Sequence, residues 1–168
     1  EELDIQNVND YQNEIININP NFIINATGIV GIEPCENDPA FAFQINTIAP
    51  INIAKISEKI RACVIHLSTH SVFNGHKDDY YYEYDKPDPI NIYGITKYAA
   101  EIAIKNYCSR YYILRMPTLY GPRRNANFGF VDKVIQWIKD GKPLSIAIDK
   151  LDSPTYTADF ALRLFEII

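Results

Sequence analysis

The sequence predicts an α/β fold: a doubly wound parallel sheet with helices on both faces. Short apolar runs rich in Ile, Val, Phe or Tyr alternate along the chain with amphipathic stretches, and this composition is typical of buried parallel strands. The alternating order also implies right-handed crossovers between neighbouring strands. The predicted strands cover residues 22–26, 63–69, 112–118 and 144–148.

The amphipathic stretches between these runs predict the helices. The first covers residues 8–17, and the next begins at Asp38-Pro39, which supplies an N-cap and a proline at the first helical position. Pro50 removes a backbone donor within that long helix, so we expect a kink or break near Ala49. Three further helices are predicted at 93–107, with Ile95, Ala99 and Ile102 along one face, at 129–139 before Gly141, and from 157 to the last residue.

Length and composition indicate a globular protein. At 168 residues, with 47% apolar and 22% charged residues, the chain can bury a substantial core. The net charge of −5 and a pI near 5.2 argue against a nucleic-acid-binding surface. The cysteines are widely spaced, which favours a reducing compartment, and no run approaches the roughly 18 apolar residues of a membrane span. We therefore expect a cytoplasmic protein with neither nucleic-acid nor membrane partners.

A Tyr-x-x-x-Lys pair, Tyr93 and Lys97, opens the predicted helix 93–107. Positions i and i+4 share a helix face, so the phenol and the ammonium can meet one bound molecule. A phenol has an ordinary pKa of about 10, and we expect the adjacent cation to lower the pKa of Tyr93 toward the working range of a proton donor. Taken alone, the pair is also what chance spacing on a half-exposed helix produces.

Small or hydroxylated residues end the first three predicted strands. Ligands of parallel sheets bind beyond the carboxyl ends of the strands, where such residues leave room. The same residue types end strands and start turns without any ligand, but their combination with Tyr93 and Lys97 favours a binding site. These strand ends are Asn25-Ala26-Thr27, Ser68-Thr69-His70 and Pro117-Thr118.

A series of motifs runs over nearly the whole chain: FIINA at 22–26, FQIN at 43–46, VIHLST at 64–69, VFNG at 72–75, NIYG at 91–94, TKYA at 96–99, LYG at 119–121 and SPTYT at 153–157. Together they resemble the dTDP-4-dehydrorhamnose reductase group of the extended short-chain dehydrogenases/reductases. The resemblance implies a Rossmann-like fold, NADPH or NADH as cofactor, a nucleotide-sugar substrate and, as one possible assembly, a homodimer.

The resemblance implies roles for the residues at matching positions. Thr69 matches the hydroxyl that bonds the substrate carbonyl, Tyr93 the proton donor, and Lys97 the residue that holds the nicotinamide ribose, so these three are the predicted catalytic residues. Asn46 matches a helix asparagine that we expect to be structural. The implied cofactor contacts are Asp4, Asn25, Ala26, Thr27, Ser68, Tyr93, Lys97, Pro117, Thr118 and Leu119. The implied substrate contacts are His70, Ser71, Ser153, Pro154 and Thr155.

The implied reaction is reduction of a 4-keto group on a nucleotide-linked sugar, a step in deoxysugar and surface polysaccharide biosynthesis. This chain has His70-Ser71 where the reductases usually carry Asp-Tyr, so the sugar itself is not fixed by the resemblance. Two alternatives stay open. One is an epimerase or dehydratase of the same superfamily, and the other is a non-catalytic regulatory or binding subunit that kept the fold.

The glycine-rich turn that meets the pyrophosphate in such folds is missing from the sequence, since no G-x-x-G-x-x-G pattern occurs. The register places the start of the resemblance after that turn, and the match stops soon after Thr157. We therefore expect a fragment, incomplete at both ends. Residues 1–121 would form an NAD(P)-binding portion, and residues 122–168 part of a small substrate-binding region that contributes to the same core.

Two other clusters are less specific. His66, His70 and His76 lack the cysteine or carboxylate spacing of a metal site, so we expect no metal. Tyrosines alternate with acidic residues between positions 78 and 85, which predicts a solvated loop over the active-site mouth with its rings packed inward. A surface for a partner is the alternative interpretation of that loop.

Overall fold

The computed structural model describes residues 3–122, 129–145, 147, 149 and 151–168. The chain forms two compact units, Glu1–Arg115 (unit 1) and Met116–Ile168 (unit 2), and each is described by itself. The division of the chain into a cofactor-binding portion 1–121 and a substrate-binding portion 122–168 concerns function and stays a prediction.

Unit 1 contains a parallel sheet that confirms the predicted α/β fold. Its strands β1(Phe22–Asn25), β2(Cys63–Thr69) and β3(Tyr111–Met116) lie in the order β1-β2-β3, and β1 and β2 run parallel. These are the first three predicted strands, with β3 ending before Thr118. The helical elements of unit 1 are α1(Val8–Ile18), α2(Ile32–Asn37), α3(Pro39–Phe43), a π-helical turn η1(Gln44–Ile48), α4(Ala49–Ile60), a 3-10 turn η2(His70–Val72) and α5(Ile92–Tyr107).

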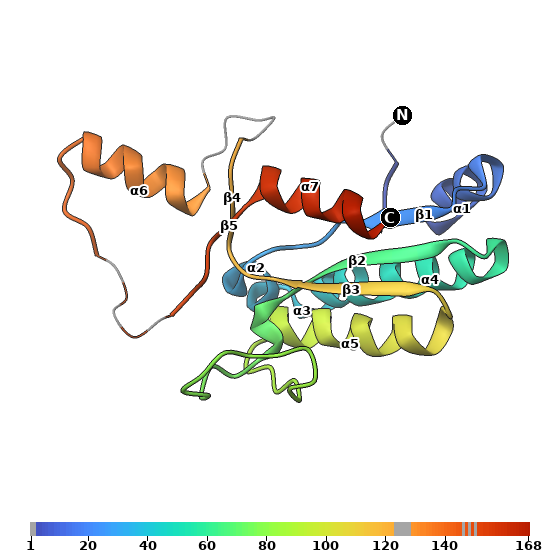
Figure 1. Cartoon of the computed structure of the whole chain (residues 1–168), viewed down its shortest axis with the longest axis horizontal. Helices are drawn as coiled ribbons and strands as arrows, with labels where there is room; N and C mark the ends of the chain where they lie inside the picture. The colour runs from blue at the N-terminus through green and yellow to red at the C-terminus, as the bar shows by residue number, and fades with distance from the viewer. Residues whose placement is uncertain (1–2, 123–128, 146, 148, 150) are drawn as a thin grey trace. The chain divides into compact units, whose positions relative to one another are not determined.

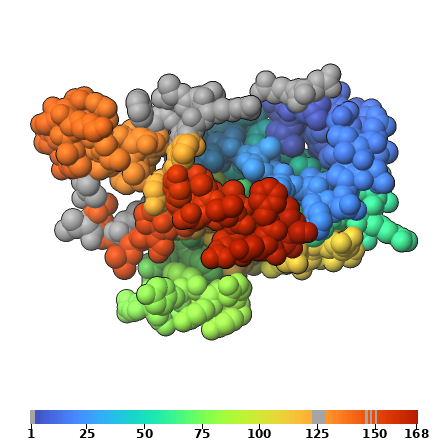
Figure 2. Space-filling model, turned by 45° about the horizontal axis from the view of Figure 1, so that its top comes forward, coloured from blue at the N-terminus to red at the C-terminus, as the bar shows by residue number. Residues whose placement is uncertain are grey.

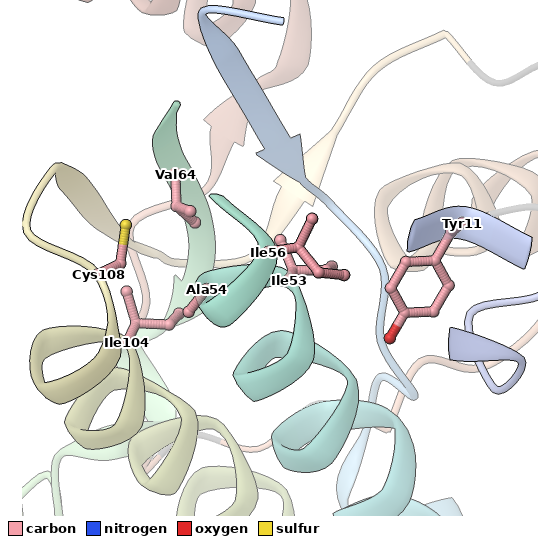
Figure 3. Close-up of a cluster of buried hydrophobic side chains, with 7 residues drawn as sticks. All are labelled: Tyr11, Ile53, Ala54, Ile56, Val64, Ile104 and Cys108. Carbon is pink, nitrogen blue, oxygen red and sulfur yellow. The ribbon is translucent and has the colours of Figure 1, made fainter. Parts of the chain in front are cut away.

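Helix α4 packs on α1 and on α5, and the core of unit 1 lies between these helices and the sheet (Figure 1). Val64 of β2 points toward the side chains of α4 and α5, and Tyr11 of α1 points toward α4 (Figure 3). Burial of these apolar side chains stabilises the unit by about 25 cal/mol for each Å² removed from water. The cluster consists of Tyr11, Ile53, Ala54, Ile56, Val64, Ile104 and Cys108.

The helix break expected near Ala49 is present as the π-helical turn η1, directly before α4. Pro50 lies at the start of α4, and its missing N–H removes a backbone donor at the point where η1 passes into α4. The wider turn places Asn46 in the interior with no exposed surface. Such π-turns occur frequently at functional sites.

Helix α5 buries a polar face. Its N-cap Asn91 accepts a hydrogen bond from the backbone N–H of Gly94, as a helix start requires. The residues it turns inward include Lys97 and Glu101, whereas Ile95 and Ile102 of the apolar stripe are 38% and 45% exposed. Apolar residues normally define the inner face of a helix, so an inward lysine and glutamate indicate a functional constraint.

Unit 2 contains two short parallel strands, β4(Leu119–Tyr120) and β5(Thr155–Tyr156), and two helices, α6(Phe130–Lys139) and α7(Thr157–Ile167). Both helices confirm the sequence-based expectation. Of the strand predicted at 144–148, residues 144, 145 and 147 adopt no strand conformation, and residues 146 and 148 lie outside the described residues. Within the described ranges, no helix has the length and apolar character needed to cross a membrane.

The segment 76–85, here called the tyrosine loop, follows η2 and stands out as the light-green atoms in Figure 2. Tyr81 packs inward by stacking on Phe73, with ring centroids 4.2 Å apart. Tyr80 and Tyr84 are 77% and 81% exposed, so the expectation that all the rings pack inward is wrong. Sequence alternation alone does not show which rings pack inward. Here the Lys77 ammonium nitrogen lies over the Tyr82 ring, 4.8 Å from the ring centroid.

Candidate active site

The carboxyl end of β2 and the first turns of α5 bring the three predicted catalytic residues together in unit 1. Thr69 is the last residue of β2, is 3% exposed, and accepts a hydrogen bond from the backbone N–H of Ser71 at 3.1 Å. Tyr93 makes a side-chain hydrogen bond with Thr69. Lys97 follows Tyr93 by one helical turn, so both side chains lie on one face of α5.

The partly buried phenol of Tyr93 is more firmly protonated than a free phenol. Burial raises its pKa, the hydrogen bond with Thr69 lowers the pKa by less, and the neighbouring Cys35 raises it further. The lowered pKa expected for Tyr93 is therefore wrong, because desolvation outweighs the hydrogen bond with Thr69 and the pKa is raised. A protonated phenol is the form that a proton donor needs.

Lys97 is a buried cation, with 4% of its surface exposed. Burial lowers the pKa of Lys97 from 10.5 to about 8, while the Glu101 carboxylate acts in the opposite direction. A lysine so close to its titration point is unusual in a structural position, and such perturbed groups cluster at functional sites.

The loop after β1 passes close to Lys97. Asn46 fixes this loop, because its Oδ1 accepts from the Ile29 N–H at 2.8 Å and its Nδ2 donates to the Ile29 carbonyl and to Thr96 Oγ1, each at 3.1 Å. A Cβ on Gly28 would lie 3.0 Å from Asn46 Oδ1 and 3.8 Å from Lys97 Nζ. A side chain at position 28 would therefore crowd Asn46 Oδ1 and approach Lys97 Nζ. The structural role expected for Asn46 is consistent with these contacts.

Asn25 shapes the start of the same loop from a buried position. Its Oδ1 accepts from the Thr27 N–H at 3.1 Å and from Thr27 Oγ1 at 2.7 Å, and its Nδ2 donates to His66 Nδ1 at 3.2 Å. Ala26 and Thr27 are exposed. Asn25, Ala26 and Thr27 are all predicted cofactor contacts. Ala26 and Thr27 are accessible, whereas the buried Asn25 fixes the loop through its hydrogen bonds to Thr27.

His66 is a fully buried neutral imidazole within β2. Among the described residues its Nε2 has no hydrogen-bond partner. Burial, together with a smaller effect of the Lys97 charge, lowers the pKa of His66 to about 3. The protein thus excludes a second positive charge from the vicinity of Lys97.

The unfolding free energy should fall on acidification because of His66. Its pKa is about 3 in the folded protein and 6.5 when unfolded, so the unfolded chain binds the extra proton as the pH drops from 6.5 toward 3. We expect the unfolding free energy of His66→Phe, measured with urea, to change less with pH across that range than that of the wild type. The exposed His76, changed to Phe, serves as the control and should leave the slope unchanged; equal slopes for wild type and His66→Phe would contradict the assignment.

Gly94 permits the close contact between α5 and η2. A Cβ at this position would lie 2.2 Å from the Ser71 carbonyl oxygen and 2.9 Å from Pro89 Cβ. Only a glycine allows this approach, which sets the distance between Tyr93 and the end of β2. Glu36 of α2 also holds the helix start, by accepting a hydrogen bond from the Ile92 N–H at 2.9 Å.

Glu101 and Arg115 belong to the site, although the sequence motifs gave neither of them a role. Ser68, expected to contact the cofactor, is 5% exposed and donates its hydroxyl proton to Glu101 Oε1 at 2.6 Å. Arg115 of β3 binds the same carboxylate, from NH2 to Oε2 at 2.7 Å and from Nε to Oε1 at 3.0 Å. Spacing could have found Glu101, since it follows Lys97 by the same four residues that separate Tyr93 from Lys97.

The remaining predicted residues of unit 1 lie at two places. His70 and Ser71 form the start of η2, directly after Thr69. Asp4 is exposed in the N-terminal turn, where its carboxylate accepts from the Gln6 N–H at 2.9 Å. Asp4 thus makes only local contacts among those the structure describes, while His70 and Ser71 border the catalytic residues.

In unit 2, two segments with predicted roles pair with each other. Residues 117–119 are expected to border the nicotinamide, and residues 153–155 are expected to bind substrate. Leu119 of β4 is aligned with Thr155 of β5, and the Thr118 carbonyl accepts from the Thr155 N–H at 2.9 Å. The Thr118 hydroxyl also bonds the Asp152 carboxylate. Pro117 precedes β4, and Ser153 and Pro154 precede β5. Their relation to Tyr93 stays a prediction.

No three His, Cys, Asp or Glu side chains within the described ranges lie together as a metal ion would require. Cys35, Cys63 and Cys108 are buried free thiols.

Comparison with known proteins gives one family. The family model described as RmlD substrate binding domain matches residues 1–168. The chain is similar to dTDP-4-dehydrorhamnose reductase of Escherichia coli (strain K12), with 32% identity over 152 residues that cover 90% of this chain and 50% of that protein. The chain spans about half the length of the curated relatives it matches.

Solved structures show the same likeness. A dTDP-4-dehydrorhamnose reductase from Bacillus anthracis, crystallised in complex with NADP, has a TM-score of 0.92 and 34% identity, covering 98% of this chain and 58% of that chain. The corresponding reductase from Clostridium acetobutylicum has a TM-score of 0.90 and 32% identity, covering 98% of this chain and 57% of that one. The Rossmann-like fold and the resemblance inferred from the motifs are confirmed.

Proposed function

Because this chain belongs to the RmlD substrate binding domain family, we propose that its protein reduces a nucleotide-linked 4-keto sugar with NADPH or NADH, in the biosynthesis of a deoxysugar for surface polysaccharide. The observation that carries the proposal is the grouping of Thr69, Tyr93 and Lys97 at the carboxyl end of β2, within a single unit. Ligands of parallel sheets bind at this end.

Each of the three residues has a task that its surroundings support. Tyr93 gives its phenolic proton to the oxygen that becomes negative as the carbonyl is reduced, and its raised pKa keeps that proton available. Thr69 bonds the same oxygen, with a hydroxyl fixed by the Ser71 N–H. Lys97, as an ammonium group, favours the phenolate that forms when the proton leaves.

The loop after β1 fits a nicotinamide cofactor. Ala26, Thr27 and Gly28 are exposed, and Gly28 brings backbone rather than a side chain close to Lys97 Nζ. A bound dinucleotide would supply the hydride, and Lys97 would hold its ribose through the ammonium group. A similar reductase structure is in complex with NADP, which supports the same cofactor class for this protein.

The substrate contacts are proposed from the segments that border this region. His70 and Ser71 follow Thr69 directly, and the segment Ser153-Pro154-Thr155 is the proposed place for the nucleotide end of the substrate. The relatives named dTDP-4-dehydrorhamnose reductase support a dTDP-linked 4-keto sugar.

The test is an assay of the intact protein for NADPH and NADH oxidation with dTDP-, GDP- and UDP-linked 4-keto sugars. We expect turnover with at least one of these substrates, and a fall of about 100- to 10,000-fold in Tyr93→Phe, the usual contribution of a positioned proton donor.

Tyr107→Phe is the matched control, because Tyr107 lies at the far end of the same helix and contacts Lys55 rather than the site. Its turnover should equal that of the wild type. Undiminished turnover in Tyr93→Phe, or no oxidation of either cofactor with any of the sugars, would exclude the proposed reductase function.

A further inference from the structure

Helix α5 presents a third polar residue on the face that carries Tyr93 and Lys97. Glu101 lies one turn beyond Lys97, and its side chain has no exposed surface. A buried carboxylate is costly unless it is paired and hydrogen-bonded. Glu101 meets this condition through partners on two other elements of unit 1.

The carboxylate is fixed from both sides. Ser68 of β2 donates to Oε1 at 2.6 Å, and Arg115 of β3 binds both oxygens, the closest contact being NH2 to Oε2 at 2.7 Å. The Arg115 guanidinium in turn lies 5.0 Å from the centroid of the Phe73 ring. Glu101 therefore ties α5 to β2 and β3 at one point, with little freedom to move.

Stability alone does not account for this ion pair. Well-packed apolar residues often replace a buried ion pair with equal or greater stability, because the desolvation cost of two charges is large. The negative charge of the Glu101 carboxylate lies instead near the buried Lys97 ammonium, which a negative charge stabilises. Both side chains are on the inner face of α5, and separation by four residues places them next to each other.

We propose that Glu101 is a positioning residue, whose carboxylate, fixed by Ser68 and Arg115, keeps Lys97 in its ammonium form and in place beside Tyr93. The proposal rests on the proposed function in so far as Lys97 must be charged to assist Tyr93. It assigns Glu101 no contact with substrate or cofactor.

The other groups near Lys97 do not supply a negative charge in the same way. His66 of β2 is neutral at physiological pH, and Arg115 is positive. The Glu101 carboxylate is the group that opposes the effect of burial on Lys97. The remaining titratable groups on elements packed against α5 are Glu33, Cys35 and Glu36 of α2, Asp38 at the start of α3, Lys55, Glu58 and Lys59 of α4, Cys63 of β2, and His70 of η2.

The test measures the titration of Lys97 directly, by NMR of lysine side chains carbon-13-labelled at Cε, in the intact protein without cofactor or substrate. The signal is assigned with Lys97→Arg. In Glu101→Gln, which keeps the shape and loses the charge, we expect Lys97 to titrate at least about one pH unit lower than in the wild type. The alkaline limb of the kcat/KM profile should move in the same direction.

Glu58→Gln is the matched control, since Glu58 is an exposed helix carboxylate that accepts from Ser109 at 2.7 Å, and it should leave the Lys97 titration in place. Arg115→Gln keeps the Glu101 carboxylate and removes its counter-charge, so Lys97 should titrate no lower than in the wild type. This second variant tests the proposal even where Glu101→Gln does not fold.

An unchanged Lys97 titration in folded Glu101→Gln would overturn the proposal, and so would a lowered titration in Arg115→Gln. Because the titration needs neither cofactor nor substrate, the two proposals fail separately. A protein without reductase turnover but with the shifted Lys97 titration would contradict the proposed reaction and support the effect of Glu101 on Lys97.

Discussion

Gly94→Ala should lower turnover by about 100-fold or more, the cost of displacing catalytic groups by about 1 Å. The added Cβ would lie 2.2 Å from the Ser71 carbonyl oxygen, a backbone atom that cannot rotate away. Either the start of α5 or η2 must move, and each movement separates Tyr93 from Thr69. Helix propensity acts in the opposite direction, since alanine is favoured over glycine by about 1 kcal/mol.

Stability should also fall in Gly94→Ala, by about 1–3 kcal/mol as in other overpacked sites. Urea unfolding and initial rates measure the two effects. The control is Gly141→Ala in unit 2, where φ is +64° and, among the described residues beyond its two chain neighbours, no heavy atom lies within 4 Å of the added Cβ. That variant should lose some stability through backbone strain and keep full turnover. Equal turnover in Gly94→Ala and the wild type would contradict the proposed contact.

Lys97→Met should abolish most turnover while the folded protein becomes more stable. The fall of the Lys97 pKa from 10.5 to about 8 corresponds to about 3 kcal/mol against the charged form at pH 7, where Lys97 is protonated in both the folded and unfolded states. Methionine fills similar volume without that cost. We expect a gain of up to about 3 kcal/mol in unfolding free energy, and a turnover loss of about 1,000-fold.

The pH dependence provides a further check on Lys97. Between pH 8 and 10.5 the folded protein releases this proton before the unfolded chain does, so wild-type stability should rise with pH in that interval. Lys97→Met should lack this rise. Lys55→Met is the control, because Lys55 is exposed over the Tyr107 ring and should affect neither turnover nor the slope. A destabilised Lys97→Met with a normal slope would contradict the buried-cation assignment.

The strands β1, β2 and β3 and the helices α1, α4 and α5 of unit 1 could be predicted because local signals agreed with the fold, whereas α2 was missed. The apolar run 63–69 became β2 without a change of boundary, and Pro50 marked the break that η1 makes before α4. The strand predicted at 144–148 was not found at its described positions. Strands β4 and β5 were missed, since two residues each carry too little periodicity to be recognised.

The candidate site was predictable where the motif itself named the residue, as with Thr69, Tyr93 and Lys97. The surroundings of those residues were not, because they depend on three-dimensional packing. The raised pKa of Tyr93 results from burial, which spacing does not reveal. Likewise, Ser68 turns toward Glu101, a contact between residues 33 positions apart.

The most direct test of the central claim follows a labelled hydride through the proposed reaction. The intact protein would be incubated with NADPH carrying deuterium at C4 of the nicotinamide, in either stereochemical form, and with a dTDP-linked 4-keto sugar, and the product analysed by NMR. We expect deuterium at C4 of the sugar with one of the two forms, and almost none in Tyr93→Phe over the same time. A protein that binds the cofactor yet leaves C4 of the sugar unlabelled with both forms would contradict the central claim.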